Sequence, residues 1–112
     1  MNKSILRQYI FICIKNAAKY EYNFSLLQDK ILSLFACEKI IVTRNKDGTV
    51  KIGFTNSNAS RHTAGNKIRS SFSELKGDDI VVTFKRTWKQ VCQSVIDENA
   101  DFHSWQSTKD QC

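Results

Sequence analysis

Residues 39–55 read KIIVTRNKDGTVKIGFT, and this stretch decides the fold. Two β-prone runs are joined through Asn45-Lys46-Asp47-Gly48, which suits a type I turn whose glycine takes the left-handed bulge position of a three-residue loop. This turn pairs Asn45 with Thr49 and sends the apolar side chains to one face, namely Ile40, Val42, Val50, Ile52 and Phe54. The other face is rich in Thr and Lys. A two-residue Asp-Gly loop would swap the two faces of the first strand.

Two helices are expected before this hairpin. The first runs over residues 4–19 with Ser4 as its cap, because its apolar residues recur at steps of three and four. The β-branched run at 10–14 leaves a strand possible there. Ser25 and Gln28 form a capping box for the second helix, whose apolar residues fall on one face.

The elements after the hairpin are read from the same signals. They are a polar loop at 56–65, a helix from about Gly65 to Lys76 that Gly77 ends, a third strand at 80–88, and a last helix at 88–99. Thr87 and Gln90 make a second capping box at the start of that last helix.

These elements predict an α+β fold with the order α-α-β-β-α-β-α. The sheet is small, contains the antiparallel hairpin at 39–55, and carries its helices on one face. At 112 residues the chain is expected to form a single domain, residues 1–99, followed by a polar tail at 100–112. A third strand beside the hairpin would merge the polar strand faces into one Thr/Lys-rich surface.

The formal charge of +6 is concentrated in the middle of the chain. Residues 39–69 contain seven Lys or Arg residues and a single acid, Asp47, whereas residues 70–112 carry a net charge of −2. Such an asymmetry indicates a polyanionic or acidic partner that docks on the middle segment.

Phosphate contacts require Lys and Arg, assisted by small polar side chains and by free backbone amides. The loop and helix that begin at Asn56 supply all of these, and a helix that starts near Gly65 would direct its free amides at an anion. No aromatic residues interleave with these charges, so double-stranded or structured nucleic acid is favoured over single strands. The predicted contact residues are Arg44, Lys46, Lys51, Arg61, His62, Lys67 and Arg69.

No motif in the sequence identifies a reaction, a cofactor or a metal site. His62 and His103 lack a second ligand at a suitable spacing, and the glycines form no phosphate-binding fingerprint. A divalent-metal nuclease would need clustered carboxylates, for which Glu38 and the pair Asp78-Asp79 are the candidates. We therefore expect no catalytic residues, no cofactor and no enzymatic activity.

The six-residue apolar run at 9–14 is far shorter than the approximately 20 residues of a membrane span. The four cysteines lack close spacing and are expected to be free thiols of a cytoplasmic protein. The sequence thus predicts a nucleic-acid-binding accessory or regulatory protein. The alternatives are an inhibitor or adaptor that docks on an acidic or nucleic-acid-binding face of a larger complex, and, third, the nuclease.

Overall fold

The computed structural model describes residues 7–45, 47–75, 77–96 and 100–101. Its helices are α1 (Phe24–Leu34), α2 (Arg61–Ser71) and α3 (Trp88–Val95), with short 3-10 turns at Ala17–Tyr20 and Gly77–Asp79. Its strands are β1 (Gln8–Ile14), β2 (Ile40–Asn45), β3 (Val50–Asn56), β4 (Ile80–Lys85) and β5 (Ala100–Asp101). The protein is thus α+β, as the sequence predicts.

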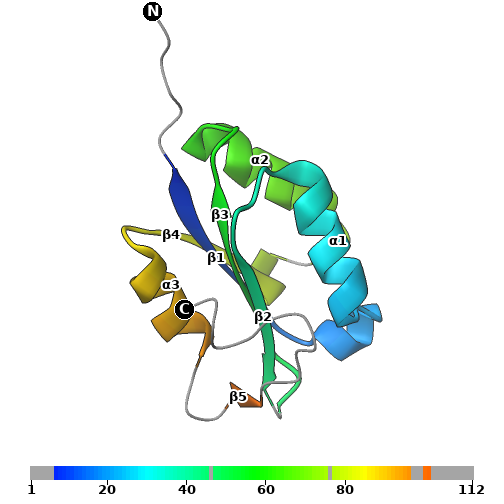
Figure 1. Ribbon diagram of the computed structural model, residues 1–112. Coiled ribbons are helices and arrows are strands. Elements are labelled where there is room, and N and C mark those ends of the chain that lie inside the picture. Colours follow the sequence, from blue (N-terminus) through cyan, green and yellow to red (C-terminus); the bar gives the residue numbers. More distant parts are fainter. Residues whose placement is uncertain (1–6, 46, 76, 97–99, 102–112) are drawn as a thin grey trace, which may run out of the picture.

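The strands form one antiparallel sheet in the order β4-β1-β3-β2-β5 (Figure 1). The first four strands and the two helices between them follow the sequence order β-α-β-β-α-β, which is the split β-α-β or ferredoxin-like arrangement. Proteins of many different functions share this arrangement, so the fold alone does not indicate what this protein does. Residues 100–101 pair with the end of β2, and the rest of the predicted tail lies outside the described residues.

The prediction of a helix at residues 4–19 is wrong, and the alternative of a strand at 10–14 is correct, because β1 spans Gln8–Ile14. β1 occupies the centre of the sheet, where Ile12 lies between Ile52 of β3 and Val82 of β4. Ile10, Ile12 and Ile14 are all fully buried. A central strand covered on both faces carries apolar residues on both, and this doubled pattern imitates helical periodicity.

The helices cover both faces of the sheet, so the prediction that they share one face is wrong. α1 and α2 pack on the face formed by Val42, Ile52 and Phe54, whereas α3 packs on the opposite face around Ile41 (Figure 1). The expected Thr/Lys surface is accordingly covered in part by α3. Thr43 is fully buried there, and its hydroxyl donates to the carbonyl oxygen of Val95 at 2.9 Å.

The hairpin is confirmed in its register. The amide of Asn45 donates to the carbonyl of Thr49 at 2.8 Å, and the amide of Gly48 donates to the carbonyl of Asn45 at 3.1 Å. Gly48 has φ +90, the left-handed conformation that the three-residue loop requires. The two strands then pair Val42 with Ile52, which places the predicted apolar face on the α1 and α2 side.

Each helix starts at a side-chain cap, but only the last cap was predicted. Thr87 accepts a hydrogen bond from the amide of Gln90 at the start of α3. α1 is capped by Asn23 and not by Ser25, and α2 is capped by Ser60, so it begins four residues before Gly65. Half of the predicted loop at 56–65 is therefore helix.

The cysteines differ from the expectation of four free thiols. Cys13 and Cys37 are free and half-buried, and burial raises the pKa of each thiol, that of Cys37 to about 11. Cys92 on α3 is disulfide-bonded, so the expectation is wrong for this residue.

Candidate nucleic-acid interface

The two described contact residues of the hairpin, Arg44 and Lys51, lie on opposite faces of the sheet. Arg44 lies on the α1 side of the sheet, and its guanidinium stands 6.0 Å from the ring centroid of Phe24. Lys51 belongs to the α3 side, where it is paired with Thr43 across the hairpin. Lys46 lies outside the described residues.

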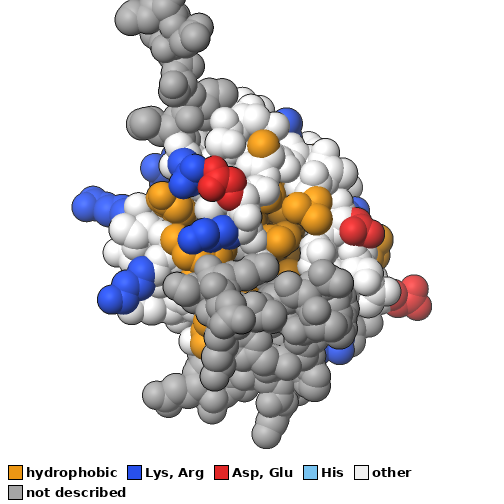
Figure 2. All heavy atoms as spheres, viewed as in Figure 1, with side chains coloured by type: hydrophobic (Ala, Val, Ile, Leu, Met, Phe, Trp, Pro, Cys, Tyr) orange, Lys and Arg blue, Asp and Glu red, His pale blue; other side chains and the backbone are white. Residues whose placement is uncertain are grey.

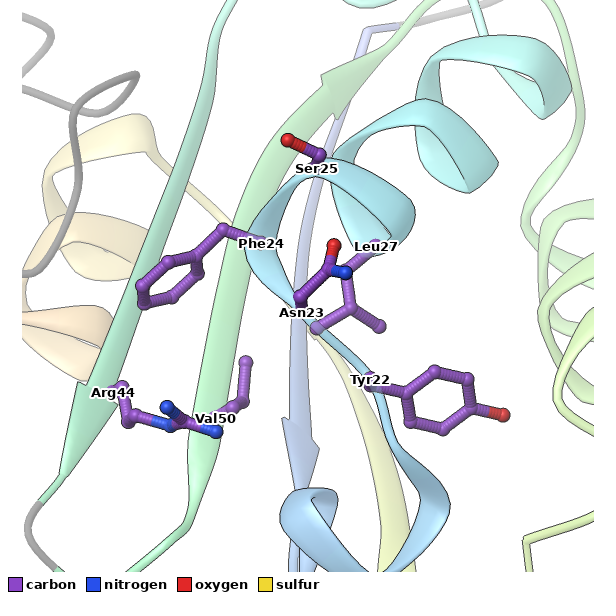
Figure 3. A pocket seen from close by; sticks show the side chains of 7 residues that line it. All are labelled: Tyr22, Asn23, Phe24, Ser25, Leu27, Arg44 and Val50. Carbon is purple, nitrogen blue, oxygen red and sulfur yellow. The ribbon is translucent and has the colours of Figure 1, made fainter.

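Arg44 instead borders a cavity of about 270 Å³ at the start of α1 (Figure 3). Phe24, Arg44 and Val50 lie on one side of this cavity and Leu27 on the other, and Asn23 and Ser25 add polar groups to its lining. The ring of Tyr22 points away from this cavity, because its hydroxyl donates to Glu74. Arg44 is the one charged residue that lines this cavity, so the cavity offers a single cation for a phosphate contact.

The four predicted residues of α2 lie on different sides of that helix. Arg61 is in its first turn and reaches toward β4, with its guanidinium 4.8 Å from the ring centroid of Phe84. His62 is exposed, and its Nε2 lies 3.2 Å from Nδ2 of Asn66. Lys67 turns toward α1, where its Nζ donates to the carbonyl of Leu34 at 3.4 Å. Arg69 is exposed near the other end of α2.

At one end of the sheet, however, basic residues from segments far apart in the sequence lie close together. The registers place the start of β1 and the ends of β3 and β4 together, because Gln8 is opposite Asn56 and Tyr9 is opposite Lys85. β2 starts at this end too, and both α2 and α3 begin here. We call this region the basic end; its members are Arg7, Lys39, Arg61, His62, Lys85, Arg86 and Lys89.

Aromatic rings hold several of these cations in place. Nζ of Lys39 lies 5.6 Å from the ring centroid of Trp88, and Nζ of Lys85 lies 5.8 Å from that of Phe11. Such contacts attract a cation to the ring face and restrict its long side chain. Figure 2 shows basic side chains gathered at the upper left of the molecule, with hydrophobic side chains between them.

Most of the described acidic residues lie away from this end. Among the residues that the structure describes, Glu38 is the acid at the basic end, and it forms an ion pair with Arg7. The opposite end of the sheet and its adjoining turns carry Glu21, Asp47, Glu74, Asp78 and Asp79. Among the described residues the basic end therefore carries a net positive charge, and the N-termini of α2 and α3 add positive potential there.

Most of this cluster could not be found by summing charge along the sequence. Residues 70–112 have a net charge of −2, which hides Lys85, Arg86 and Lys89 behind the acids at 97–110. Arg7 precedes β1, and a helix at residues 4–19 does not bring it beside β3 and β4. A local window over KRTWK at 85–89 would have shown the basic character of the turn before α3.

The carboxylates proposed for a nuclease are not brought together. Glu38 lies at the basic end, whereas Asp79 lies at the opposite end, where it accepts a hydrogen bond from the hydroxyl of Tyr20 at 2.7 Å. Within the described ranges, no three His, Cys, Asp or Glu residues are grouped closely enough to hold a metal ion.

Comparison with known proteins identifies no relative. No protein-family model, curated protein or solved structure matches the chain. In the part of the chain that the structure describes, no helix has both the length and the apolar character needed to cross a membrane.

Proposed function

We propose that this protein binds double-stranded or structured nucleic acid through the basic end, as a non-enzymatic accessory or regulatory protein. The observation that carries the proposal is the convergence there of six Lys and Arg side chains, with one described acid that is already paired to Arg7. Two helix N-termini add positive potential at the same end. Phosphates need this combination of cations and polar donors.

The burial of Trp88 favours phosphate contact over base stacking at this position. Trp88 is only 9% exposed, and its ring lies against Lys39. A ring that is buried beneath a cation cannot receive an unstacked base, which single-strand binders require. The cations themselves remain at the surface, as a phosphate backbone requires.

Two of the seven residues predicted from the sequence, Arg61 and His62, belong to the proposed contact. Arg69 extends it along the exposed face of α2, which contains no acid between residues 61 and 71. Arg44 and Lys51 lie toward the opposite end of the sheet, on different faces, and are not part of the same contact.

Binding of a fluorescent DNA or RNA duplex, measured by anisotropy over a series of salt concentrations, tests the proposal. Each phosphate contact contributes about 0.9 to the slope of log K against log salt. The double variant Arg61→Gln/Lys89→Gln should therefore lower the slope by about 2. Glutamine keeps an aliphatic stem over Phe84 while it removes the charge.

Lys15→Gln/Lys19→Gln is the matched control, because it removes the same charge at the other end of the sheet. We expect its salt slope to equal that of the wild type. An equal loss of slope in both double variants would show that only net charge matters, and would refute a contact at the basic end.

The same surface suits an inhibitor or adaptor that docks on an acidic protein face. This alternative is distinguished by the duplex titration itself. Absence of duplex binding at about 50 mM salt, where phosphate contacts are strong, would remove the nucleic-acid proposal and favour the protein partner.

A further inference from the structure

β4 forms one edge of the sheet and pairs, among the described residues, with β1 alone. The amide of Lys15 donates to the carbonyl of Asp79 at 2.8 Å, so Lys15 and Asp79 form a hydrogen-bonded pair of the β1–β4 ladder. Because hydrogen-bonded and non-bonded pairs alternate in an antiparallel ladder, the amide and carbonyl groups of Ile80, Val82 and Phe84 point away from β1.

Most of this edge lacks the usual protection against pairing. Edge strands are commonly protected by proline, by a bulge, or by charged residues within the strand. β4 reads IVVTFK: Lys85 at its last position is its one charged residue, and residues 80–84 contain neither a charge nor a proline. Val81 is 45% exposed, one of the largest exposures of a big apolar side chain in the described residues.

The charges that flank β4 are arranged so that the strand complements itself. Asp78 precedes the strand and Arg86 follows it. In an antiparallel pair of identical strands, the acidic end of each copy lies beside the basic end of the other. A parallel pair would place like charges together at both ends.

We propose that β4 pairs with β4 of a second copy of this chain. The two strands are antiparallel and are related by a two-fold axis that passes between the two Val82 residues. This register sets Ile80 opposite Phe84 of the second copy and brings Asp78 beside Arg86. It lets the outward groups of the strand form about six backbone hydrogen bonds. A shift by two residues would leave outward groups unpaired and would misalign the charges.

The resulting dimer has one continuous sheet across both copies. α2 packs on one face of the sheet and α3 on the other (Figure 1), so the two-fold axis brings each helix to the same face as its counterpart. The two basic ends then point in opposite directions. The dimer is thus bivalent for any ligand of that end, but the pairing itself does not depend on the proposed function.

Sedimentation equilibrium over a range of protein concentrations tests the pairing. Val82→Pro removes an amide that points away from β1, so the β1–β4 ladder is retained while the outer ladder is blocked. We expect the wild type to dimerise, and Val82→Pro to weaken the dimer at least tenfold with an unchanged circular dichroism spectrum. Val82→Thr, which keeps the amide, should behave as the wild type.

A charge exchange tests the register without altering the backbone. Asp78→Lys and Arg86→Glu each place like charges beside one another at both ends of the interface, so each variant alone should dimerise less well than the wild type. An equimolar mixture should recover a heterodimer. A monomeric wild type at about 1 mM, a dimer that persists in Val82→Pro, or a mixture that recovers nothing would each overturn the proposal.

Discussion

Gly53 of β3 provides the space that lets α3 pack on the sheet. A Cβ atom at this position would lie 2.4 Å from Cγ1 of Val91 and 2.9 Å from Cγ2 of Val95, both on α3, and 3.2 Å from Cγ2 of Ile41. Carbon atoms attract one another best at about 3.5–4.0 Å, so two of these distances are strongly repulsive. We therefore expect Gly53→Ala to displace α3 from the sheet or to strain its side chains.

The expected loss follows from the costs of overpacking a core. Such insertions cost about 1–3 kcal/mol, and the two contacts below 3.0 Å place Gly53→Ala near about 2 kcal/mol. For a chain of this size, 1 kcal/mol corresponds to about 4 °C in Tm, so the midpoint should fall by about 8 °C. Urea and thermal unfolding, followed by far-ultraviolet circular dichroism, measure both quantities.

Gly65 provides the matched control, because the same substitution there should have the opposite sign. Gly65 lies inside α2, and its Cβ would meet only Nη1 of Arg69 at 3.7 Å, an ordinary contact. Gly65→Ala should stabilise the protein by about 0.5–1 kcal/mol through helix propensity. Gly53→Ala combined with Val91→Ala should lose less stability than the sum of the two single changes. Additive losses, or a Gly53→Ala variant as stable as the wild type, would refute the packing proposed for α3.

Three further predictions concern single side chains. At pH 8 the Cys37 thiol, whose pKa burial raises to about 11, should react with iodoacetamide on the order of 100-fold more slowly than an ordinary thiol, as peptide mass spectrometry can measure. Tyr22→Phe removes the hydroxyl that donates to Glu74 and should cost about 1 kcal/mol in urea unfolding at pH 7. Because this bond lowers the pKa of Glu74, its stabilisation is present above the ordinary carboxyl pKa, so the difference from wild type should shrink as the pH falls below about 4. Thr43→Val leaves the Val95 carbonyl without its buried donor and should cost about 1–2 kcal/mol, whereas an unchanged urea midpoint would contradict that role.

The hairpin was predictable because its signals are local. Asp47 and Gly48 determine the turn, the turn fixes the register, and the register then decides which side chains enter the core. Asp47 adds to this locally, since its carboxylate accepts a hydrogen bond from the amide of Thr49 at 2.9 Å, and this contact lowers its pKa. No distant residue is needed for any of these steps.

β1 was not predictable in the same way, because its conformation depends on its neighbours. The stretch YIFICI at 9–14 is apolar on both faces, and only the cover of α1 and α2 on one face and α3 on the other makes a strand the better conformation. The wrong prediction of a helix at residues 4–19 is linked to the wrong prediction that all helices lie on one face of the sheet. A chain read with all its helices on one face has no place for a central strand that is apolar on both.

The basic end depends on the same long-range information. Arg7, Lys39 and Lys85 come together because β1 lies between β3 and β4 in the sheet. The distribution of charge along the sequence does not show this strand order. The start of α2 was misplaced for a related reason. Ser60 and Thr63 form a cap that the polar composition of 56–65 concealed within a predicted loop.

The cover of both sheet faces limits where a partner can bind. A four-stranded antiparallel sheet of this arrangement can receive nucleic acid on an open face, but here α3 occupies that face and Trp88 is nearly buried beneath Lys39. In the part of the sheet that the structure describes, the basic end and the β4 edge remain open to a partner, and these are the two surfaces of the proposals above. They are separable by experiment, because Arg61→Gln/Lys89→Gln alters the end alone and Val82→Pro alters the edge alone. If the edge variant bound an isolated duplex as the wild type does but lost its avidity for a duplex array, the end would be the contact and the edge the means of presenting two of them.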